Sequence, residues 1–198
     1  MFDVVAYTDA SNRIDQKPGE PGPALGLLIP TQQGVIARAL SFPLPLPFLH
    51  GKDERGNNHG NTILTEGLAV LSALIRYPNT FQGKTVLFYT DSTGLVQNYK
   101  KCKAKGFYNA HLIRCLYLVK ERLHCNLTIT WQRRRSTAGT RAADTLTHQD
   151  FSEVPPHVNY QKIEELPKPI LVTLNQSIVY KTNSFNKLWP RILKYWEN

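Results

Sequence analysis

The sequence predicts an α/β domain with a mixed five-stranded sheet flanked by helices, followed by a small C-terminal extension. Short β-branched runs bounded by turn residues alternate with longer segments of helical periodicity. The first three strands follow one another closely, which implies an antiparallel meander, whereas helices separate the later strands. With 198 residues, 41% of them hydrophobic, the chain suffices for one domain of ordinary size plus an appendage.

The N-terminal part of the chain contains three short apolar runs. They predict strands at residues 2–8, 24–29 and 35–42. Asp9 lies directly after the first strand, at its carboxyl end. Proline and glycine residues separate the first two strands, and Gly34 turns the chain into the third. Prolines then end the third strand, so the polar run 50–61 is predicted to be a long exposed loop.

Helices and strands alternate in the next hundred residues. Helices are predicted at 62–77, at 92–99, after Gly106 and at 140–148, with strands at 84–90 and 126–132 between them. Thr62 can cap the first of these helices and Pro78 ends it, so Glu66 lies near its N-terminus. The fourth strand delivers Asp91 to the following helix, and the last helix carries Asp144.

A change in composition after Gln149 separates the predicted domain, residues 1–149, from a linker and C-terminal extension, residues 150–198. Prolines mark the start of this extension. The elements predicted in it are a hairpin, at 170–174 and 177–180, and a short helix rich in aromatic residues, near 185–195. About 50 residues barely support a core of their own, so we expect the extension to pack on the domain or on a partner chain.

The charge of the chain indicates an anionic partner. Lysine and arginine outnumber aspartate and glutamate by 24 to 15, which gives a net charge of +9 and a pI of about 9.5. Phosphate backbones suit such a charge, although anionic membranes and acidic proteins suit it too. No apolar run approaches the roughly 20 residues that span a bilayer, and the first residues do not resemble a signal peptide. We therefore expect no association with a membrane.

The cysteines and histidines do not form a recognisable metal or disulfide pattern. Three cysteines are an odd number, and they lack zinc-ligand spacing: Cys102, Cys115 and Cys125. A reducing, intracellular compartment is the simplest interpretation, and the sequence does not distinguish nucleus from cytoplasm. His111, His124 and His148 are expected at the surface or at helix caps. Because the chain starts directly on a predicted core strand, we also expect a segment cut from a larger polypeptide.

Four carboxylates occupy positions where ligand sites of α/β proteins are usually found. Asp9 and Asp91 follow strands, whereas Glu66 and Asp144 lie on helices. We predict that the first and fourth strands are adjacent and parallel, which brings the two strand-end aspartates to the same edge of the sheet, where Glu66 and Asp144 approach from helices. Like charges gathered there are unfavourable unless cations neutralise them, and oxygen ligands of this kind suit Mg²⁺ or Mn²⁺. The sequence therefore predicts a site for divalent cations.

Around these carboxylates the chain resembles the ribonuclease H family, particularly the domains attached to reverse transcriptases of retroelements such as LTR retrotransposons and retroviruses. The motifs that carry the resemblance are Tyr7-Thr8-Asp9-Ala10-Ser11, Thr65-Glu66-Gly67-Leu68-Ala69, Tyr89-Thr90-Asp91-Ser92 and Ala142-Ala143-Asp144-Thr145-Leu146. The resemblance covers about residues 2–149. The order of the four acids, with the glutamate on the first helix, is more specific than any single motif.

The resemblance implies a ribonuclease H-like fold and a metal-dependent endonuclease that hydrolyses the RNA strand of RNA/DNA hybrids. The catalytic residues, which would also hold two Mg²⁺ or Mn²⁺ ions, would be Asp9, Glu66, Asp91 and Asp144. Such ions activate water for in-line attack on the scissile phosphate. Contacts to 2′-hydroxyl groups and to the shape of the duplex would select the hybrid. A reverse-transcriptase domain of the same polyprotein is a further expected partner.

Two basic runs are candidates for binding nucleic acid. Arg133, Arg134 and Arg135 occupy the loop in which many ribonucleases H have a mobile histidine. These arginines can bind phosphates, or they can neutralise the acidic cluster in the absence of substrate; we predict that they act on substrate and are not ion-pair partners alone. The second run forms a solvated helix end or grips the DNA strand, and it consists of Lys100, Lys101, Lys103 and Lys105. The polar loop could also supply His59 or Asn61.

Alternatives remain on the sequence alone. Each acid taken singly could be an ordinary turn or capping residue. A degenerate module of the same fold could bind nucleic acid or scaffold a polyprotein without cutting. The 3′ to 5′ exonucleases of the same superfold have a second acid close to the first, which Asp9-Ala10-Ser11 lacks. Transposases and integrases place a glutamate on a helix after the second aspartate, where only Glu121 is found.

Overall fold

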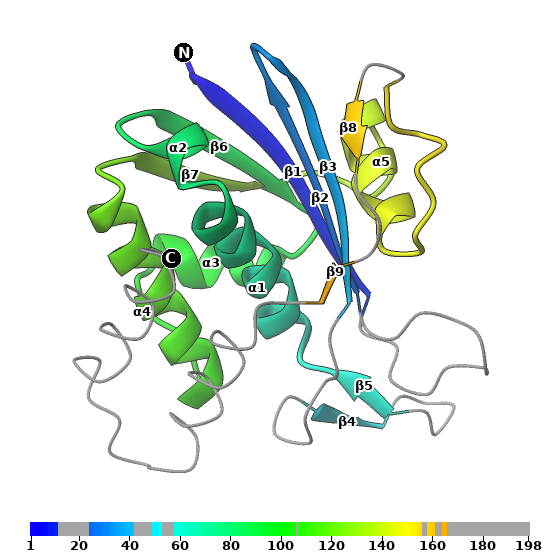
Figure 1. The fold of residues 1–198 in the computed structure, drawn as a ribbon. Helices are drawn as coiled ribbons and strands as arrows, with labels where there is room; N and C mark the ends of the chain where they lie inside the picture. Colours follow the sequence, from blue (N-terminus) through cyan, green and yellow to red (C-terminus); the bar gives the residue numbers. More distant parts are fainter. Residues whose placement is uncertain are drawn as a thin grey trace.

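The main sheet is mixed, as the sequence predicts. The computed structural model describes residues 1–11, 24–41, 49–52, 58–105, 107–155, 158–160 and 164–165. The main strands are β1 (Val4–Ser11), β2 (Ala24–Thr31), β3 (Gly34–Ser41), β6 (Thr85–Thr90) and β7 (Asn126–Trp131). They lie in the order β3-β2-β1-β6-β7, antiparallel from β3 to β1 and parallel from β1 to β7 (Figure 1). The predicted mixed sheet, with its first and fourth strands adjacent and parallel, is confirmed.

Helices cover both faces of this sheet. In the described residues they are α1 (Thr62–Arg76), α2 (Pro78–Phe81), α3 (Thr93–Lys100), α4 (Phe107–Arg122) and α5 (Ala138–Leu146). The first four lie on one side, and α5 lies on the other side over β1, β2 and β3 (Figure 1). The core is divided in the same way. A large cluster lies on the α1 and α4 side, and a smaller cluster under α5 contains Leu28, Ala37, Ala142, Leu146 and Val154.

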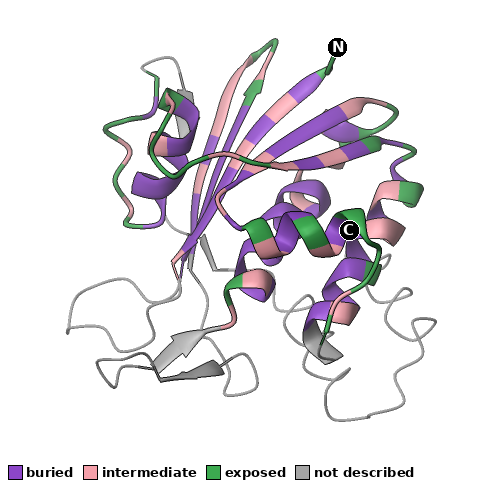
Figure 2. Cartoon of the chain, turned by 180° about the vertical axis from the view of Figure 1, so that it is seen from behind, coloured by how far each residue is buried: buried purple, intermediate pink, exposed green. Residues whose placement is uncertain are grey.

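Strand β2, which lies between β1 and β3, is buried on both faces. Its first six residues are all buried, as expected of the unbroken run Ala-Leu-Gly-Leu-Leu-Ile, and Figure 2 shows buried residues along the middle of the sheet. A Cβ added to Gly26 would lie 2.0 Å from the backbone oxygen of Ala143 in α5. A Cβ added to Gly139 would lie 2.4 Å from the ring of Tyr7. The two glycines thus let α5 lie directly on the sheet, which fixes where Asp144 is placed.

Three local predictions are wrong. The polar run 50–61 is not a loop throughout, because β4 (Leu49–Lys52) pairs antiparallel with β5 (Asn58–Gly60). The N-cap of α1 is Asn61 and not Thr62, since the Asn61 side chain accepts a hydrogen bond from the backbone N–H of Leu64. His111 is buried in α4 and not at the surface, with only 2% of its area exposed.

The chain after α5 returns to the sheet. Val154 is buried against the cluster under α5, and β8 (Val158–Tyr160) and β9 (Glu164–Glu165) each pair parallel with β3. The division of the chain at residue 149 stays a prediction, and the predicted hairpin and aromatic helix of the extension lie outside the described residues. Within the part of the chain that the structure describes, no helix is both long and apolar enough to span a membrane.

Candidate active site

Three of the four predicted acids meet near the carboxyl ends of β1 and β6. Asp9 belongs to β1, Asp91 directly follows β6, and Glu66 lies in the second turn of α1. One carboxylate oxygen of each lies within 4.8 Å of the corresponding oxygens of the other two. The parallel pairing of β1 with β6 brings the two aspartates together, and α1 packs across β1 to add the glutamate. We call these three residues the acidic triad.

Glu66 is held between the two strand ends. Its side chain is 2% exposed and accepts two hydrogen bonds. The backbone N–H of Ala10, the residue after Asp9, donates to Oε1 at 3.1 Å. The hydroxyl of Thr90, the residue before Asp91, donates to Oε2 at 3.1 Å. The glutamate therefore fixes the spacing of the two aspartates while keeping lone pairs on both oxygens for a further ligand.

The triad is electrostatically unfavourable without a cation. Burial, together with the charge of Asp91, raises the pKa of Asp9 to about 7, against a smaller opposing effect of Arg134. Burial and the charges of Asp9 and Asp91 raise the pKa of Glu66 well above its ordinary value. Burial also raises the pKa of Asp91. All three carboxyl groups therefore hold protons more tightly than they would in water, because they are buried and, for Asp9 and Glu66, close to other acids.

The residues of the triad fit a hard divalent cation. Asp9 is buried, and its Oδ2 atom accepts no hydrogen bond in the described structure. A buried carboxylate oxygen without a donor is costly unless a positive charge faces it. Carboxylate oxygens are ligands that suit Mg²⁺ and Mn²⁺. An ion held here would be bound by Asp9, Glu66 and Asp91.

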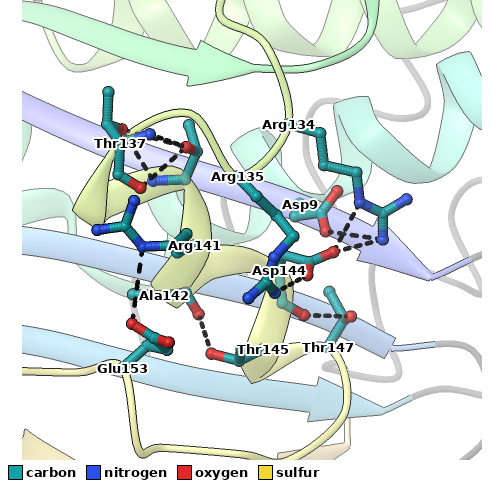
Figure 3. A network of polar contacts seen from close by, with 11 residues as sticks. Asp9, Arg134, Arg135, Thr137, Arg141, Ala142, Asp144, Thr145, Thr147 and Glu153 are labelled. Carbon is teal, nitrogen blue, oxygen red and sulfur yellow. Dashed lines mark hydrogen bonds and ion pairs between the residues drawn. The ribbon is translucent and has the colours of Figure 1, made fainter.

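The fourth acid, Asp144, is already neutralised by arginine. It lies on α5 with 6% of its area exposed. Arg134 Nε donates to Oδ1 at 2.7 Å, and an Arg135 terminal nitrogen donates to Oδ2 at 2.5 Å (Figure 3). Although burial acts to raise it, these hydrogen bonds lower the pKa of Asp144 below its ordinary value. The same Arg134 side chain reaches 3.8 Å from Asp9 Oδ2, so it joins Asp144 to the triad.

The loop that carries these arginines is tied to α5. The Ser136 hydroxyl donates to the Arg133 carbonyl, and Thr137 forms a capping box with Thr140 at the start of the helix. Arg135 has a φ of 56°, a left-handed conformation that costs a residue with a side chain roughly 1 kcal/mol or more. The costly backbone conformation coincides with the ion pair to Asp144, so the loop is shaped to present its guanidinium groups to that acid.

The other basic candidates are exposed. No ion pair or hydrogen bond joins the Arg133 side chain to another described residue, so one of the three predicted arginines faces solvent. Lys100 ends α3, and it is exposed together with Lys101, Lys103 and Lys105. None of these four lysines forms an ion pair with the acids in the described structure. Their roles in binding nucleic acid stay predictions.

Sequence reasoning missed two residues that support the acids. Thr90 anchors Glu66, and the indole N–H of Trp131 donates to the backbone oxygen of Asp91 at 3.1 Å. Thr90 belongs to a quoted motif, but nothing in that motif reveals its partner. Asn61 is occupied as the cap of α1, and its amide also donates to Asn109 at 2.9 Å. The side chain of His59 lies outside the described residues.

Comparison with known proteins identifies the fold. No protein-family model matches the sequence, and no curated protein matches it. The N-terminal ribonuclease H domain of a Mycobacterium tuberculosis protein, solved as a fusion with maltose-binding protein, is similar in structure, with 15% identity and a TM-score of 0.50. That match covers 75% of this chain and 98% of the other.

Two further structures are similar. The protease–reverse transcriptase of prototype foamy virus matches with 18% identity and a TM-score of 0.51, over 78% of this chain and 21% of the viral chain. A ribonuclease H1 named LC11, solved in complex with an RNA/DNA hybrid, matches with 16% identity and a TM-score of 0.49, over 76% and 97% of the two chains. Together with the strand order, the likeness to the first two shows that this chain has a ribonuclease H-like fold.

Proposed function

We propose that this protein is a metal-dependent endonuclease that hydrolyses the RNA strand of RNA/DNA hybrids. The observation that carries the proposal is the convergence of Asp9, Glu66 and Asp91 from three separate elements, with ligand oxygens within 4.8 Å of one another. These acids lie near the carboxyl ends of two parallel strands, where α/β sheets usually bind their ligands. The net charge of +9 suits a polyanionic substrate.

The chemistry follows from what the residues can hold. Divalent cations bound by the triad would activate water and stabilise the leaving 3′ oxygen of the scissile phosphate. Asp9 and Asp91 would be the central ligands, with Glu66 keeping their spacing through Ala10 and Thr90. We assign Asp144 to the same catalytic set, in the two-ion arrangement that the sequence resemblance implies. The exposed arginine and lysine runs would bind the two backbones of the duplex.

A retroelement origin is part of the proposal. It is supported by the four acidic motifs, which resemble those of domains attached to retroelement reverse transcriptases. If this origin is correct, a reverse-transcriptase domain of the same polyprotein is the natural partner of the chain. Copurification of this chain with such a domain, expressed from one polyprotein, would test the partnership.

The proposal is tested by cleavage of a labelled RNA/DNA hybrid by the full chain. We expect internal cuts in the RNA strand that require Mg²⁺ or Mn²⁺, and no cuts in duplex DNA of the same sequence. Asp91→Asn should abolish cleavage, whereas Glu121→Gln, which removes an exposed carboxylate of α4, should not. Absence of metal-dependent cleavage by the unmodified chain would refute the proposal.

One observation favours a second candidate function. Both oxygens of Asp144 are engaged by arginines, as expected of a module that binds nucleic acid but has lost its cutting site. Such a module would bind the hybrid with strong salt dependence and leave it intact. The same assay separates the two candidates, because binding without cleavage at saturating Mg²⁺ is expected only of the degenerate module.

A further inference from the structure

Arg134 lies between two of the four acids. Its Nε atom donates to Asp144 Oδ1 at 2.7 Å, and a terminal nitrogen of the same group also pairs with that oxygen and reaches 3.8 Å from Asp9 Oδ2. Figure 3 shows the guanidinium group next to both carboxylates, with Arg135 on the far side of Asp144. Among the described acids, Arg135 forms its ion pair with Asp144. Arg134 is therefore the cation that joins the fourth acid to the triad.

The formal charges of the site balance with a single divalent ion. Four ionised carboxylates and the guanidinium groups of Arg134 and Arg135 leave a charge of −2, and one Mg²⁺ cancels it. The remaining negative charge lies in the triad, where Asp9 Oδ2 is buried and accepts no hydrogen bond. The Asp144 oxygens, in contrast, both have charged donors. A second divalent ion beside Asp144 would have to displace an arginine.

We propose that in the substrate-free protein Arg134 occupies the cation position between Asp9 and Asp144, so that the site binds one divalent ion at the triad and not two. This inference rests on the proposed function, since it concerns the same acids. The second ion of two-ion chemistry has a place only after the Arg134 side chain has left Asp144. That side chain is 55% exposed, so it can turn into solvent or onto an anionic group without opening the loop.

Mn²⁺ titration calorimetry on the metal-free full chain tests the inference. The unmodified chain should bind one ion. Arg134→Gln should bind two, because the amide keeps the size of the side chain but gives up its charge. Combining Arg134→Gln with Asp144→Asn should return the number to one. Arg141→Gln, which removes an arginine of α5 that pairs with Glu153, is the matched control and should bind one ion.

Two results would overturn the inference: two ions bound by the unmodified chain, or one ion bound by a folded Arg134→Gln variant. If Arg134→Gln does not fold, Asp144→Asn alone decides. This variant should bind the single ion with unchanged affinity. Loss of binding, or a much lower affinity, would show that Asp144 is already a ligand of that ion. Cleavage of a hybrid is measured separately. One bound ion without cleavage would refute the proposed function alone, and two bound ions with cleavage would refute this inference alone.

Discussion

Asp91 and Asp144 are two aspartates of the same acidic site, but their electrostatic surroundings are opposite. The pKa of Asp91 is raised, first by burial, whereas hydrogen bonds from Arg135 and Arg134 lower the pKa of Asp144. The difference arises from the elements that carry them. The strand end of β6 faces two other acids, while α5 faces the arginine loop that precedes it. The need for an external cation is therefore concentrated at the triad.

The largest expected effect concerns catalysis at the triad. Asp91→Asn should lower the rate of hybrid cleavage on the order of 10³-fold, because it removes a charged ligand of the cation that would act on the scissile phosphate. The fold should persist, since the asparagine is isosteric and Asp91 is only partly buried. Single-turnover cleavage and thermal unfolding, measured on the same preparation, check both statements. Unchanged cleavage would remove Asp91 from the catalytic set.

The next largest effect comes from displacing α5, the helix that carries Asp144, without changing a residue of the triad. Gly26→Ala puts a methyl group where the backbone oxygen of Ala143 lies 2.0 Å away, so α5 must move off the sheet. We expect a loss of roughly 3 kcal/mol in the free energy of unfolding, as is typical of an overpacked core. Chemical denaturation measures it. Gly83→Ala provides the contrast, because the left-handed φ of 70° would strain the alanine backbone although no neighbouring atom lies within 4 Å.

The pH dependence of the metal-free protein should reveal the triad. The pKa of Asp9 is about 7 in the folded protein, against about 3.9 in an unfolded chain. The folded state therefore binds more protons between these values, and the stability falls as the pH rises from about 4 to about 7. Glu66 and Asp91 act in the same direction. Thermal unfolding at several pH values should show this decline.

Two observations would decide whether the triad causes that decline. Saturating Mg²⁺ should remove most of it, because the ion favours the ionised carboxylates. The contribution of Asp144 to stability depends on pH in the opposite direction. Its lowered pKa adds stability that is lost only as the pH falls below about 4. A metal-free protein whose stability rises steadily from pH 4 to pH 7 would contradict the raised pKa values of the triad.

A pair of neutralising substitutions tests the comparison directly. Asp9→Asn should stabilise the metal-free protein, since it relieves repulsion among buried acids. Asp144→Asn should destabilise it by about 1 kcal/mol, because two ion pairs are lost while the half-exposed arginines stay hydrated. Thermal unfolding in a chelating buffer measures both. If both substitutions stabilise the protein, or both destabilise it, the electrostatic surroundings of the triad and of Asp144 do not differ as described.

The sequence predicted the sheet and the meeting of Asp9 with Asp91, because both depend on signals that are local along the chain. Apolar runs mark the strands, and parallel neighbours bring their carboxyl ends to one edge of the sheet. Details that depend on competition between similar residues were missed. Asn61 and Thr62 are both good helix caps, and only the packed structure shows that Asn61 is used. The burial of His111 depends on which face of α4 meets the core.

The pairing of Asp144 with arginines could not be predicted from the sequence for a different reason. A run of three arginines next to an acidic site can bind substrate or neutralise the acids, and residue types alone do not separate these uses. The outcome depends on the left-handed φ of Arg135 and on where the loop joins α5. The structure assigns Arg134 and Arg135 to Asp144, and the prediction that they act on substrate is left untested for all three arginines.

The smallest expected effect separates Arg133 from its two neighbours. Arg133 is exposed and has no side-chain partner among the described residues, so its removal leaves the acidic site intact. If it contacts a phosphate, Arg133→Gln should weaken hybrid binding and reduce the slope of log affinity against log salt by about 0.9, because one fewer counterion is released. Thermal stability should not change. Fluorescence anisotropy of a labelled hybrid across a salt series, with Asp91→Asn in the background to prevent cleavage, measures the slope. An unchanged slope would mean that Arg133 does not contact the backbone, and the exposed lysines from Lys100 to Lys105 would then be the next residues to replace.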